Sequence, residues 1–158
     1  MHCTAFRQSH SSIVLFDGIA PNRAAIAEII ANSLKDAEQP GLGIWLLHRS
    51  GIDCAGCALL RPQPSTGLVE LVYLLHPAHW RQGLATRMAW TTMSVAFQTI
   101  PVIVAGADGA NTASIGVMRR LGMRFNRKVQ YPLGTGVEYF RRHDDPAPDP
   151  RISRLSWS

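Results

Sequence analysis

The sequence has few cysteines, no long apolar run and no internal repeat, and each absence excludes a class of protein. Three cysteines in 158 residues are too few for the disulfide framework of a small secreted domain, and their odd number also argues against one. No apolar run approaches the ~20 residues needed to cross a bilayer. The first twelve residues lack the apolar core of a secretory signal. We therefore expect a cytoplasmic, thiol-reduced protein with no membrane partner.

Composition and length favour one folded domain. Hydrophobic residues make up 46% of the chain and charged residues 17%, which excludes a disordered polymer. We assign residues 1–142 to a single domain and residues 143–158 to a Pro- and Asp-rich tail, expected to be extended or mobile. The net charge of +5 is ordinary for a soluble protein. A nucleic-acid-binding protein is an alternative that rests on this charge alone, so we do not expect nucleic acid as the partner.

The apolar pattern predicts alternating strands and helices. The expected strands are residues 12–16, 44–48, 54–60, 68–75 and 101–105, followed by a hairpin of residues 124–132 and 136–142. The expected helices lie between Pro21 and Gln39, over 84–97 and over 112–121. Two apolar stripes have helical spacing: Ile26, Ile29, Ile30 and Leu34 in the first helix, and Leu84, Met88, Thr91 and Val95 in the second. The order strand, helix, strand from 68 to 105 predicts a right-handed parallel crossover.

Two short motifs invite a metal interpretation, and neither is complete. Cys54 and Cys57 form a CxxC, but there is no second CxxC and the pair lies within a predicted strand, where it points to opposite faces. Packing in the core explains these cysteines better. His76 and His79 lie three residues apart without an evident third ligand. We expect no metal site.

The informative segment is HPAHWRQGLATRM, residues 76–88, where a buried strand ends and a short glycine-containing turn opens a helix. Helix N-termini present unpaired N–H groups and the positive end of the helix dipole. A glycine there allows an anion to approach the backbone, so the turn is a candidate diphosphate cradle, or else a plain structural turn. There is neither a GxxxxGK[ST] P-loop nor a GxGxxG dinucleotide fingerprint.

Two longer stretches carry a resemblance to a known family. Residues 70–88, ELVYLLHPAHWRQGLATRM, resemble the E-x-x-Y-x-(x)-x-P-x-x-W-x-x-G-x-A-T pattern of the RimJ/RimL-like branch of the GNAT superfamily of acetyl-CoA-dependent N-acetyltransferases. Residues 111–125, NTASIGVMRRLGMRF, resemble that branch's N-x-x-S-(x)4-x-K/R-L-G-F/M element. The upstream segment GIWLLHRSGIDCAGCALL matches the family's hairpin more loosely, so the resemblance covers about residues 40–141. It implies an α/β (α+β) fold with a mixed, mostly antiparallel sheet, a splayed parallel pair of central strands and flanking helices.

The resemblance also implies where acetyl-CoA would bind. The superfamily pattern for the diphosphate loop is Q/R-x-x-G-x-G/A; here Trp80 takes the Q/R position, while Gly83 and Ala85 keep the small residues. By this resemblance the loop that binds the coenzyme A diphosphate through backbone amides is Arg81, Gln82, Gly83, Leu84, Ala85 and Thr86. The strand backbone at Leu74, Leu75 and His76 would pair with the pantetheine arm, Asn111 would contact that arm, Ser114 would lie near the thioester sulfur, and Arg120 would reach a phosphate.

The implied chemistry is direct acyl transfer from a thioester to an amine. The amine attacks only when neutral, so a base must take its proton, and a backbone N–H near Leu74 or Leu75 would hold the developing oxyanion. Glu70 is our candidate base because it is the only charge in an apolar strand, and burial of a lone carboxyl disfavours its charged form. The alternative is that Glu70 is solvated or ion-paired. Glu138, in the last strand, is the second candidate.

One residue departs from the family pattern. Many members have a tyrosine general acid in the second motif, and the matching residue here is Met118, which we expect to pack in the core with Ile115 and Leu121. Either Ser114 is the acid or the thiolate leaves unaided; Tyr73 and Tyr131 are further candidate donors.

The acceptor is left open by the residues. The resemblance implies a protein N-terminus or a small-molecule amine, and a homodimer is the family's common state. A non-catalytic acyl-CoA-binding regulatory module on the same fold is the alternative to an enzyme, because the family's tyrosine is missing.

Overall fold

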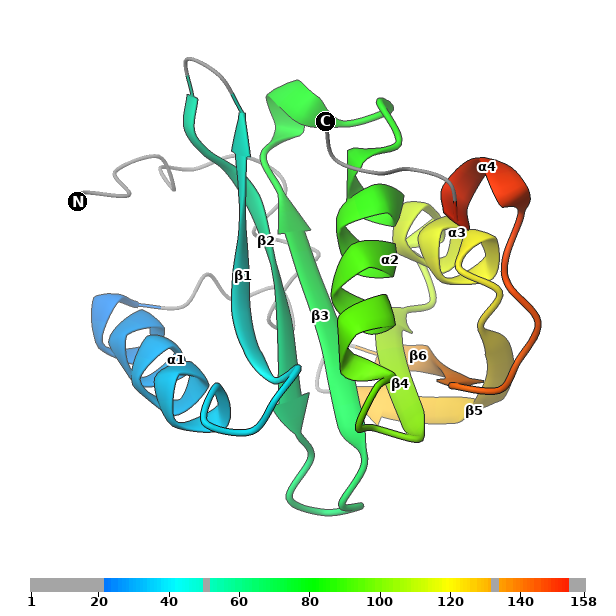
Figure 1. Cartoon of the computed structure of the whole chain (residues 1–158), viewed down its shortest axis with the longest axis horizontal. Coiled ribbons are helices and arrows are strands. Elements are labelled where there is room, and N and C mark those ends of the chain that lie inside the picture. The colour runs from blue at the N-terminus through cyan, green and yellow to red at the C-terminus, as the bar shows by residue number, and fades with distance from the viewer. Residues whose placement is uncertain (1–21, 50–51, 132–133, 154–158) are drawn as a thin grey trace.

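Six strands form one mixed sheet in the order β1-β2-β3-β4-β6-β5 (Figure 1). The computed structural model describes residues 22–49, 52–131 and 134–153. The strands are β1 Gly43–Arg49, β2 Ile52–Pro62, β3 Val69–Leu75, β4 Val102–Asp108, β5 Arg124–Tyr131 and β6 Gly134–Arg142. The helices are α1 Arg23–Asp36, α2 Leu84–Ala96, α3 Thr112–Arg120 and α4 Pro150–Ser153, with a 3₁₀ turn at Pro77–His79. The strand expected at residues 12–16 lies outside the described residues.

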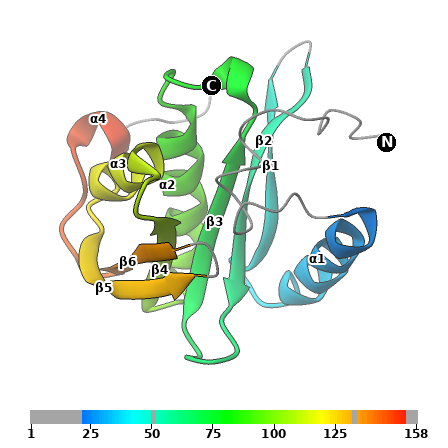
Figure 2. The same cartoon turned by 180° about the vertical axis from the view of Figure 1, so that it is seen from behind.

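The sheet confirms the predicted topology. β3 and β4 pair in parallel, whereas β1 with β2, β2 with β3, β4 with β6 and β5 with β6 are antiparallel. α2 connects the two parallel strands, as the strand–helix–strand order predicts. It stands in front of β3 in Figure 1 and behind it in Figure 2, so it covers one face of the sheet.

Side-chain caps and a glycine mark the helix ends. The Asn22 side chain accepts a hydrogen bond from the Ala25 N–H and begins α1, and the Asn111 side chain accepts one from the Ser114 N–H and begins α3. Gly122, at φ 71°, follows α3 in the left-handed conformation that ends a helix.

The apolar stripe predicted on the second helix is confirmed at Met88 and Leu84, which lie in or against the core, but not at Val95, and the stripe predicted on the first helix is mostly exposed. On α1 the apolar stripe points away from the core, since Ile26, Ile30 and Leu34 are 40%, 44% and 66% exposed while Ser33 is buried. On α2 Val95 is exposed, and the face on the sheet consists of Thr86, Met88, Ala89, Thr92, Met93 and Ala96. Small residues such as Ala89 and Ala96 let α2 lie close to the strands, which an argument from apolar spacing alone overlooks.

Strand alternation divides the sheet into two faces with different contents. Leu60, Leu71 and Ile103 point to the face that α2 covers and belong to the main core. Their strand neighbours Arg61, Glu70 and Val104 point to the opposite face. The two candidate carboxylates lie on this second face, because Glu138 pairs with Gly106, two residues along from Val104.

The segment after β6 is more ordered than the sequence predicts. The buried Arg141 guanidinium donates through Nη1 to the Gly122 carbonyl and through Nη2 to the Asp145 and Pro146 carbonyls. The Asp145 carboxylate accepts from the Arg142 N–H and from Arg124. These contacts lead the chain into α4, which packs beside α2 and α3 (Figure 1).

Candidate active site

The parallel strands β3 and β4 separate soon after they begin. Their register contains only two pairs, Val69 with Ile103 and Glu70 with Val104. From Leu71 to Leu75, β3 remains paired with β2 on its other side but has no ladder partner on β4. The separation confirms the expected splayed pair and leaves a strand edge with unpaired backbone groups in the middle of the sheet.

The direction of the backbone groups corrects the prediction for this edge. His76 donates its N–H to the Ala55 carbonyl on the β2 side, so it does not face the splay. Because backbone groups alternate in direction along an antiparallel pair, Leu74 also points to β2, while Tyr73 and Leu75 point to the splay. Of the three residues predicted to point their backbone N–H and C=O groups into the splay, only Leu75 does so. Tyr73, which was not among the three, also points its backbone groups there.

The end of β3 is held by the turn that follows it. The indole Nε1 of Trp80 donates to the Leu75 carbonyl at 2.8 Å, although nearly half of the side chain is exposed. Two residues of the turn are left-handed, Arg81 at φ 59° and Gly83 at φ 73°. Positive φ is unfavourable for arginine, so this turn has a demanding geometry.

The N-terminus of α2 is open. Its N-cap residue is Gly83, which has no side chain to accept a hydrogen bond from the first turn, in contrast to the asparagine caps of α1 and α3. A Cβ added to Gly83 would meet none of the described atoms within 4 Å, so there is open space beside the cap residue. An uncapped helix start with room before it suits an anion.

Two arginines lie near this helix start. Arg81 is an exposed residue of the turn itself. Arg120, at the end of α3, donates from Nε to Thr86 Oγ1 at 3.4 Å, which places its guanidinium beside the first turn of α2. The structure thus brings together the two ends of the predicted set, the residues 81–86 and Arg120.

Ser114 and Tyr73 form a closed pair of hydrogen bonds beside the splay. The Ser114 hydroxyl donates to the Tyr73 oxygen at 2.9 Å, and the Tyr73 hydroxyl donates to the Ser114 carbonyl at 3.0 Å. Burial raises the pKa of Tyr73 to about 12, although the Ser114 hydrogen bond and the charge of Arg120 act in the opposite direction. The phenol is therefore protonated at neutral pH. Asn111 lies one turn before Ser114 and uses its side-chain oxygen as the helix cap.

Glu70 is ion-paired, which is the second of the two settings considered for it. Arg61 donates from Nε at 3.0 Å and from Nη2 at 2.9 Å, both to Oε2, and the Glu70 side chain is 18% exposed. Arg61 stands directly opposite Glu70 in the β2–β3 register, so this partner becomes apparent only once the register is known.

Glu138 is bound more completely. Its Oε1 accepts from Asn126 at 2.8 Å and from the Arg127 Nε at 2.9 Å, and Oε2 accepts a longer bond from Arg127. The side chain is only 7% exposed. Arg127 is again the cross-strand partner, here in the β5–β6 register.

Tyr131 lies over two glycines on the face that carries both carboxylates. A Cβ added to Gly136 on β6 would collide with the Tyr131 ring, and one added to Gly106 on β4 would collide with its hydroxyl. Gly106 pairs with Glu138 in the β4–β6 ladder. The two glycines therefore form a slot that directs the Tyr131 hydroxyl to β4, a placement that the sequence did not predict.

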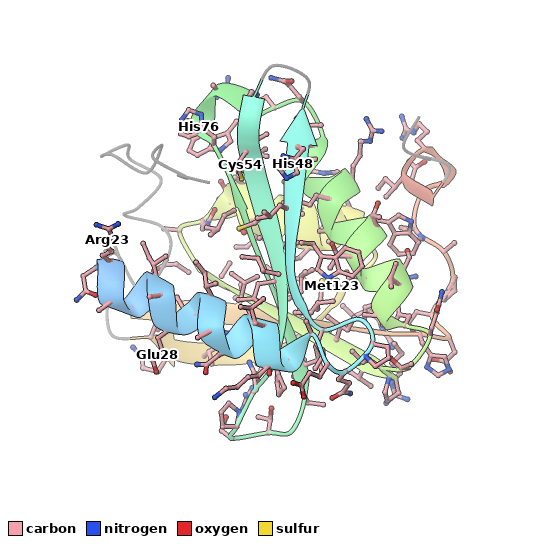
Figure 3. All side chains as sticks on the ribbon, turned by 60° about the vertical axis from the view of Figure 1, so that its left-hand side comes forward. Arg23, Glu28, His48, Cys54, His76 and Met123 are labelled. Atoms are coloured by element: carbon pink, nitrogen blue, oxygen red, sulfur yellow. The ribbon has the colours of Figure 1, made fainter. Side chains whose placement is uncertain are left out.

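The remaining candidates have structural surroundings. Met118 and Leu121 are fully buried in the main core, as predicted. His76 accepts a hydrogen bond from the Ala78 N–H through Nδ1, and it lies near Cys54 at one end of the sheet (Figure 3). In the described part of the chain no group of three His, Cys, Asp or Glu side chains is placed to hold a metal ion. Nor does that part contain a helix long and apolar enough to span a membrane.

A scan against protein-family models matches residues 4–124 to the acetyltransferase (GNAT) domain. Solved structures similar to this chain include an acetyltransferase from Agrobacterium tumefaciens, at 20% identity and a TM-score of 0.71, covering 85% of this chain and 79% of that one. A second is a protein from Salmonella typhimurium assigned as an acetyltransferase and solved with its cofactor acetyl-CoA, at 19% identity and a TM-score of 0.69, covering 89% and 87%. A third is a ribosomal-protein-alanine N-acetyltransferase from Brucella melitensis, at 17% identity and a TM-score of 0.65, covering 78% and 80%. At these identities the structures establish a shared fold.

Proposed function

The chain belongs to the GNAT acetyltransferase family, and from that membership we propose that it transfers the acetyl group of acetyl-CoA directly to a primary amine. The observation that carries the proposal is the combination of the splayed β3–β4 pair with the open N-terminus of α2. The splayed strand pair exposes backbone groups that can bind an extended ligand with amide groups, and the helix N-terminus presents amides that can bind a diphosphate. Acetyl-CoA contains both chemical parts in one molecule.

The residues present fit this co-substrate. The amides of residues 83–86 would bind the diphosphate, with Arg81 and Arg120 adding positive charge. The edge of Tyr73 and Leu75 would bind the pantetheine amides. The developing oxyanion needs a hydrogen-bond donor, so we assign this contact to a backbone N–H of Tyr73 or Leu75, the residues that point to the splay.

Glu70 is our proposed proton acceptor. Arg61 occupies Oε2, and within the described residues Oε1 has no hydrogen-bond partner, so one oxygen of the carboxylate is available. It would take the proton of the attacking amine directly or through water. Glu138 is a weaker candidate because three donor contacts occupy its buried carboxylate.

The leaving thiolate has two routes. Ser114 lies beside the splay and would supply a proton only by giving up its hydrogen bond to Tyr73. Otherwise the thiolate departs unaided. The Ser114→Ala variant distinguishes the routes, since loss of a general acid lowers kcat by about 10²- to 10⁴-fold.

For the acceptor we propose a protein N-terminus or a small-molecule amine, in line with the RimJ/RimL-like motifs. Cytoplasmic location, a homodimer and a single domain over residues 1–142 belong to the same proposal. A non-catalytic acyl-CoA-binding module is the second candidate, because Met118 is buried and the Ser114 and Tyr73 hydroxyls are bonded to each other.

Thermal unfolding with acetyl-CoA tests the co-substrate. At a hundredfold excess over Kd, binding stabilises the folded protein by about 2.7 kcal/mol, which should raise Tm by several degrees. Release of free thiol in the presence of a panel of amines then tests catalysis. Stabilisation without thiol release from any amine would favour the non-catalytic module, and no stabilisation at millimolar acetyl-CoA would contradict the proposal.

A matched pair of variants at Gly83 tests the position of the diphosphate. Asn and Asp both tolerate positive φ, have the same size, and would meet no neighbouring atom at Cβ. Gly83→Asp adds a negative charge in front of the helix start and should weaken CoA binding by about tenfold or more. Gly83→Asn should bind within about threefold of the unaltered protein. Equal effects of the two variants would place the diphosphate elsewhere.

A further inference from the structure

A basic depression lies between the end of α3 and the C-terminal segment. Its volume is about 560 Å³, and it is lined on one side by Arg119 and Arg120 and on the other by residues that include Asp149 and Arg151. Three guanidinium groups against one carboxylate leave an excess of two positive charges. An anion is the ligand that such a lining favours.

A hydrogen bond from Nε fixes the orientation of each of the three arginine side chains. Arg119 donates from Nε to the Tyr139 hydroxyl at 3.3 Å, and Arg120 donates from Nε to Thr86. Arg151 donates from Nε and Nη2 to the Asp149 carboxylate. In the part of the chain that the structure describes, the terminal nitrogens of Arg119 and Arg120 have no further hydrogen-bond partner. These nitrogens are the ones that bind phosphate oxygens in a forked geometry.

Arg120 connects the depression to the proposed diphosphate site. Arg120 lines the depression and also bonds Thr86, in the first turn of α2. In coenzyme A the diphosphate has the pantetheine arm on one side and a 3′-phosphorylated adenosine on the other. If the arm enters the splay between β3 and β4, the adenosine end must leave the diphosphate on the other side, where Arg120 stands.

We propose, on the basis of the proposed function, that this depression binds the 3′-phosphate of coenzyme A and that the C-terminal segment supplies one of its cations, Arg151. The domain holds this segment in place beside the depression, because Arg141 binds the Asp145 and Pro146 carbonyls and Pro148 is buried. It also lies beyond residue 124, where the match to the family model ends. The protein therefore selects the 3′-phosphorylated coenzyme through a part of the chain outside the matched domain.

Removing Arg151 should leave the fold intact. Its side chain is 89% exposed and its only ion pair is with Asp149, two residues away. Exposed ion pairs contribute little to stability. An effect of the Arg151→Gln substitution on binding can therefore be separated from unfolding, and thermal unfolding of the free variants checks this directly.

Titration calorimetry with CoA and with 3′-dephospho-CoA tests the proposal. The unaltered protein should bind CoA at least tenfold more tightly than dephospho-CoA, and this preference should fall at high salt. Arg151→Gln and Arg119→Gln should each reduce the preference about three- to tenfold by weakening CoA alone. Arg23→Gln, at the exposed start of α1 far from the depression (Figure 3), should retain it.

The outcomes separate this inference from the proposed function. Equal affinity for CoA and dephospho-CoA in the unaltered protein would overturn the 3′-phosphate site while leaving the acetyltransferase proposal standing. Binding of neither compound would overturn the proposed function itself. Deleting residues 147–158 should weaken the binding of CoA and leave the binding of dephospho-CoA unchanged. If the deletion made both compounds bind more tightly, the segment would cover the site rather than form part of it, and the inference would be wrong.

Discussion

A cross-strand arginine determines what the carboxylate at position 70 can do. Arg61 binds Oε2 of Glu70 through two nitrogens and so fixes the position of the carboxylate. Its other oxygen can hold the ammonium form of an amine and accept its proton as the amine attacks. The strand composition predicted a carboxyl group in apolar surroundings, because the opposing strand is not visible until the register is known.

Replacing Glu70 tests its part in turnover. We expect Glu70→Gln to lower kcat/KM about 100-fold, with the largest loss below neutral pH, where less of the free amine is already neutral. Arg61→Gln should lower kcat/KM less than Glu70→Gln does, because the carboxylate remains and only the contact that positions it is lost. Glu38→Gln, an exposed residue, is the control. Unaltered pH–rate profiles for Glu70→Gln would remove this residue from the mechanism.

The buried phenol of Tyr73 makes stability depend on alkaline pH. Its pKa is raised to about 12 in the folded protein, mainly by burial, from an ordinary value of 10.0. The protonated phenol therefore contributes stability that is complete below pH 10 and is lost as the pH rises towards 12. Urea unfolding should show that Tyr73→Phe loses less stability than the unaltered protein between these pH values, by up to about 2 kcal/mol. Parallel pH curves for the two proteins would contradict this.

At the scale of elements, the hairpin of β5 and β6 is arranged around the slot of Gly106 and Gly136. No turn requires glycine in the middle of these strands, so the sequence pattern carries no signal for it. The reason becomes apparent only when β4, β5 and β6 are adjacent, because the Tyr131 side chain crosses both glycines. The periodicity of the sequence predicted where the strands lie. The contact of the Tyr131 side chain with β4 and β6 explains why glycine occupies positions 106 and 136.

Substitution in the slot should show this dependence. Gly106→Ala should destabilise the protein by about 1–3 kcal/mol, because the new methyl group meets the Tyr131 hydroxyl. In Tyr131→Ala this obstacle is absent, so adding Gly106→Ala to that variant should cost much less. Urea unfolding of the two single variants and the double variant measures the coupling. Additive losses would mean that the Tyr131 side chain is not what makes alanine unfavourable at position 106.

At the scale of the whole molecule, the sequence predicted the order of elements, the parallel crossover and the turn before α2. These features depend on local signals: the apolar strand ending before Pro77, the glycine at position 83, and the Asn111 and Gly122 helix ends. It did not predict which face of α1 is buried, the partners of Glu70 and Glu138, or the order of the C-terminal segment. Each of these depends on contacts between residues distant in the sequence.

Arg141 shows how such contacts join the C-terminal segment to the domain. Burial lowers the pKa of its guanidinium, which nevertheless binds the Gly122, Asp145 and Pro146 carbonyls and faces the Trp90 ring at 5.4 Å. We expect Arg141→Met to lower the free energy of unfolding by about 2–4 kcal/mol, because buried carbonyls lose a charged donor. It should also speed proteolysis after residue 142. The neighbouring exposed Arg142→Met should change neither measurement.

Because the β3–β4 ladder contains only two residue pairs, we expect the halves β1-β2-β3 and β4-β6-β5 of the sheet to move relative to each other more than the strands within each half do. An elongated ligand bound between the separated ends of β3 and β4 would contact both halves and reduce this motion. Amide hydrogen exchange would register this as slower exchange along β3 and β4 at once, even in the half that the ligand contacts least.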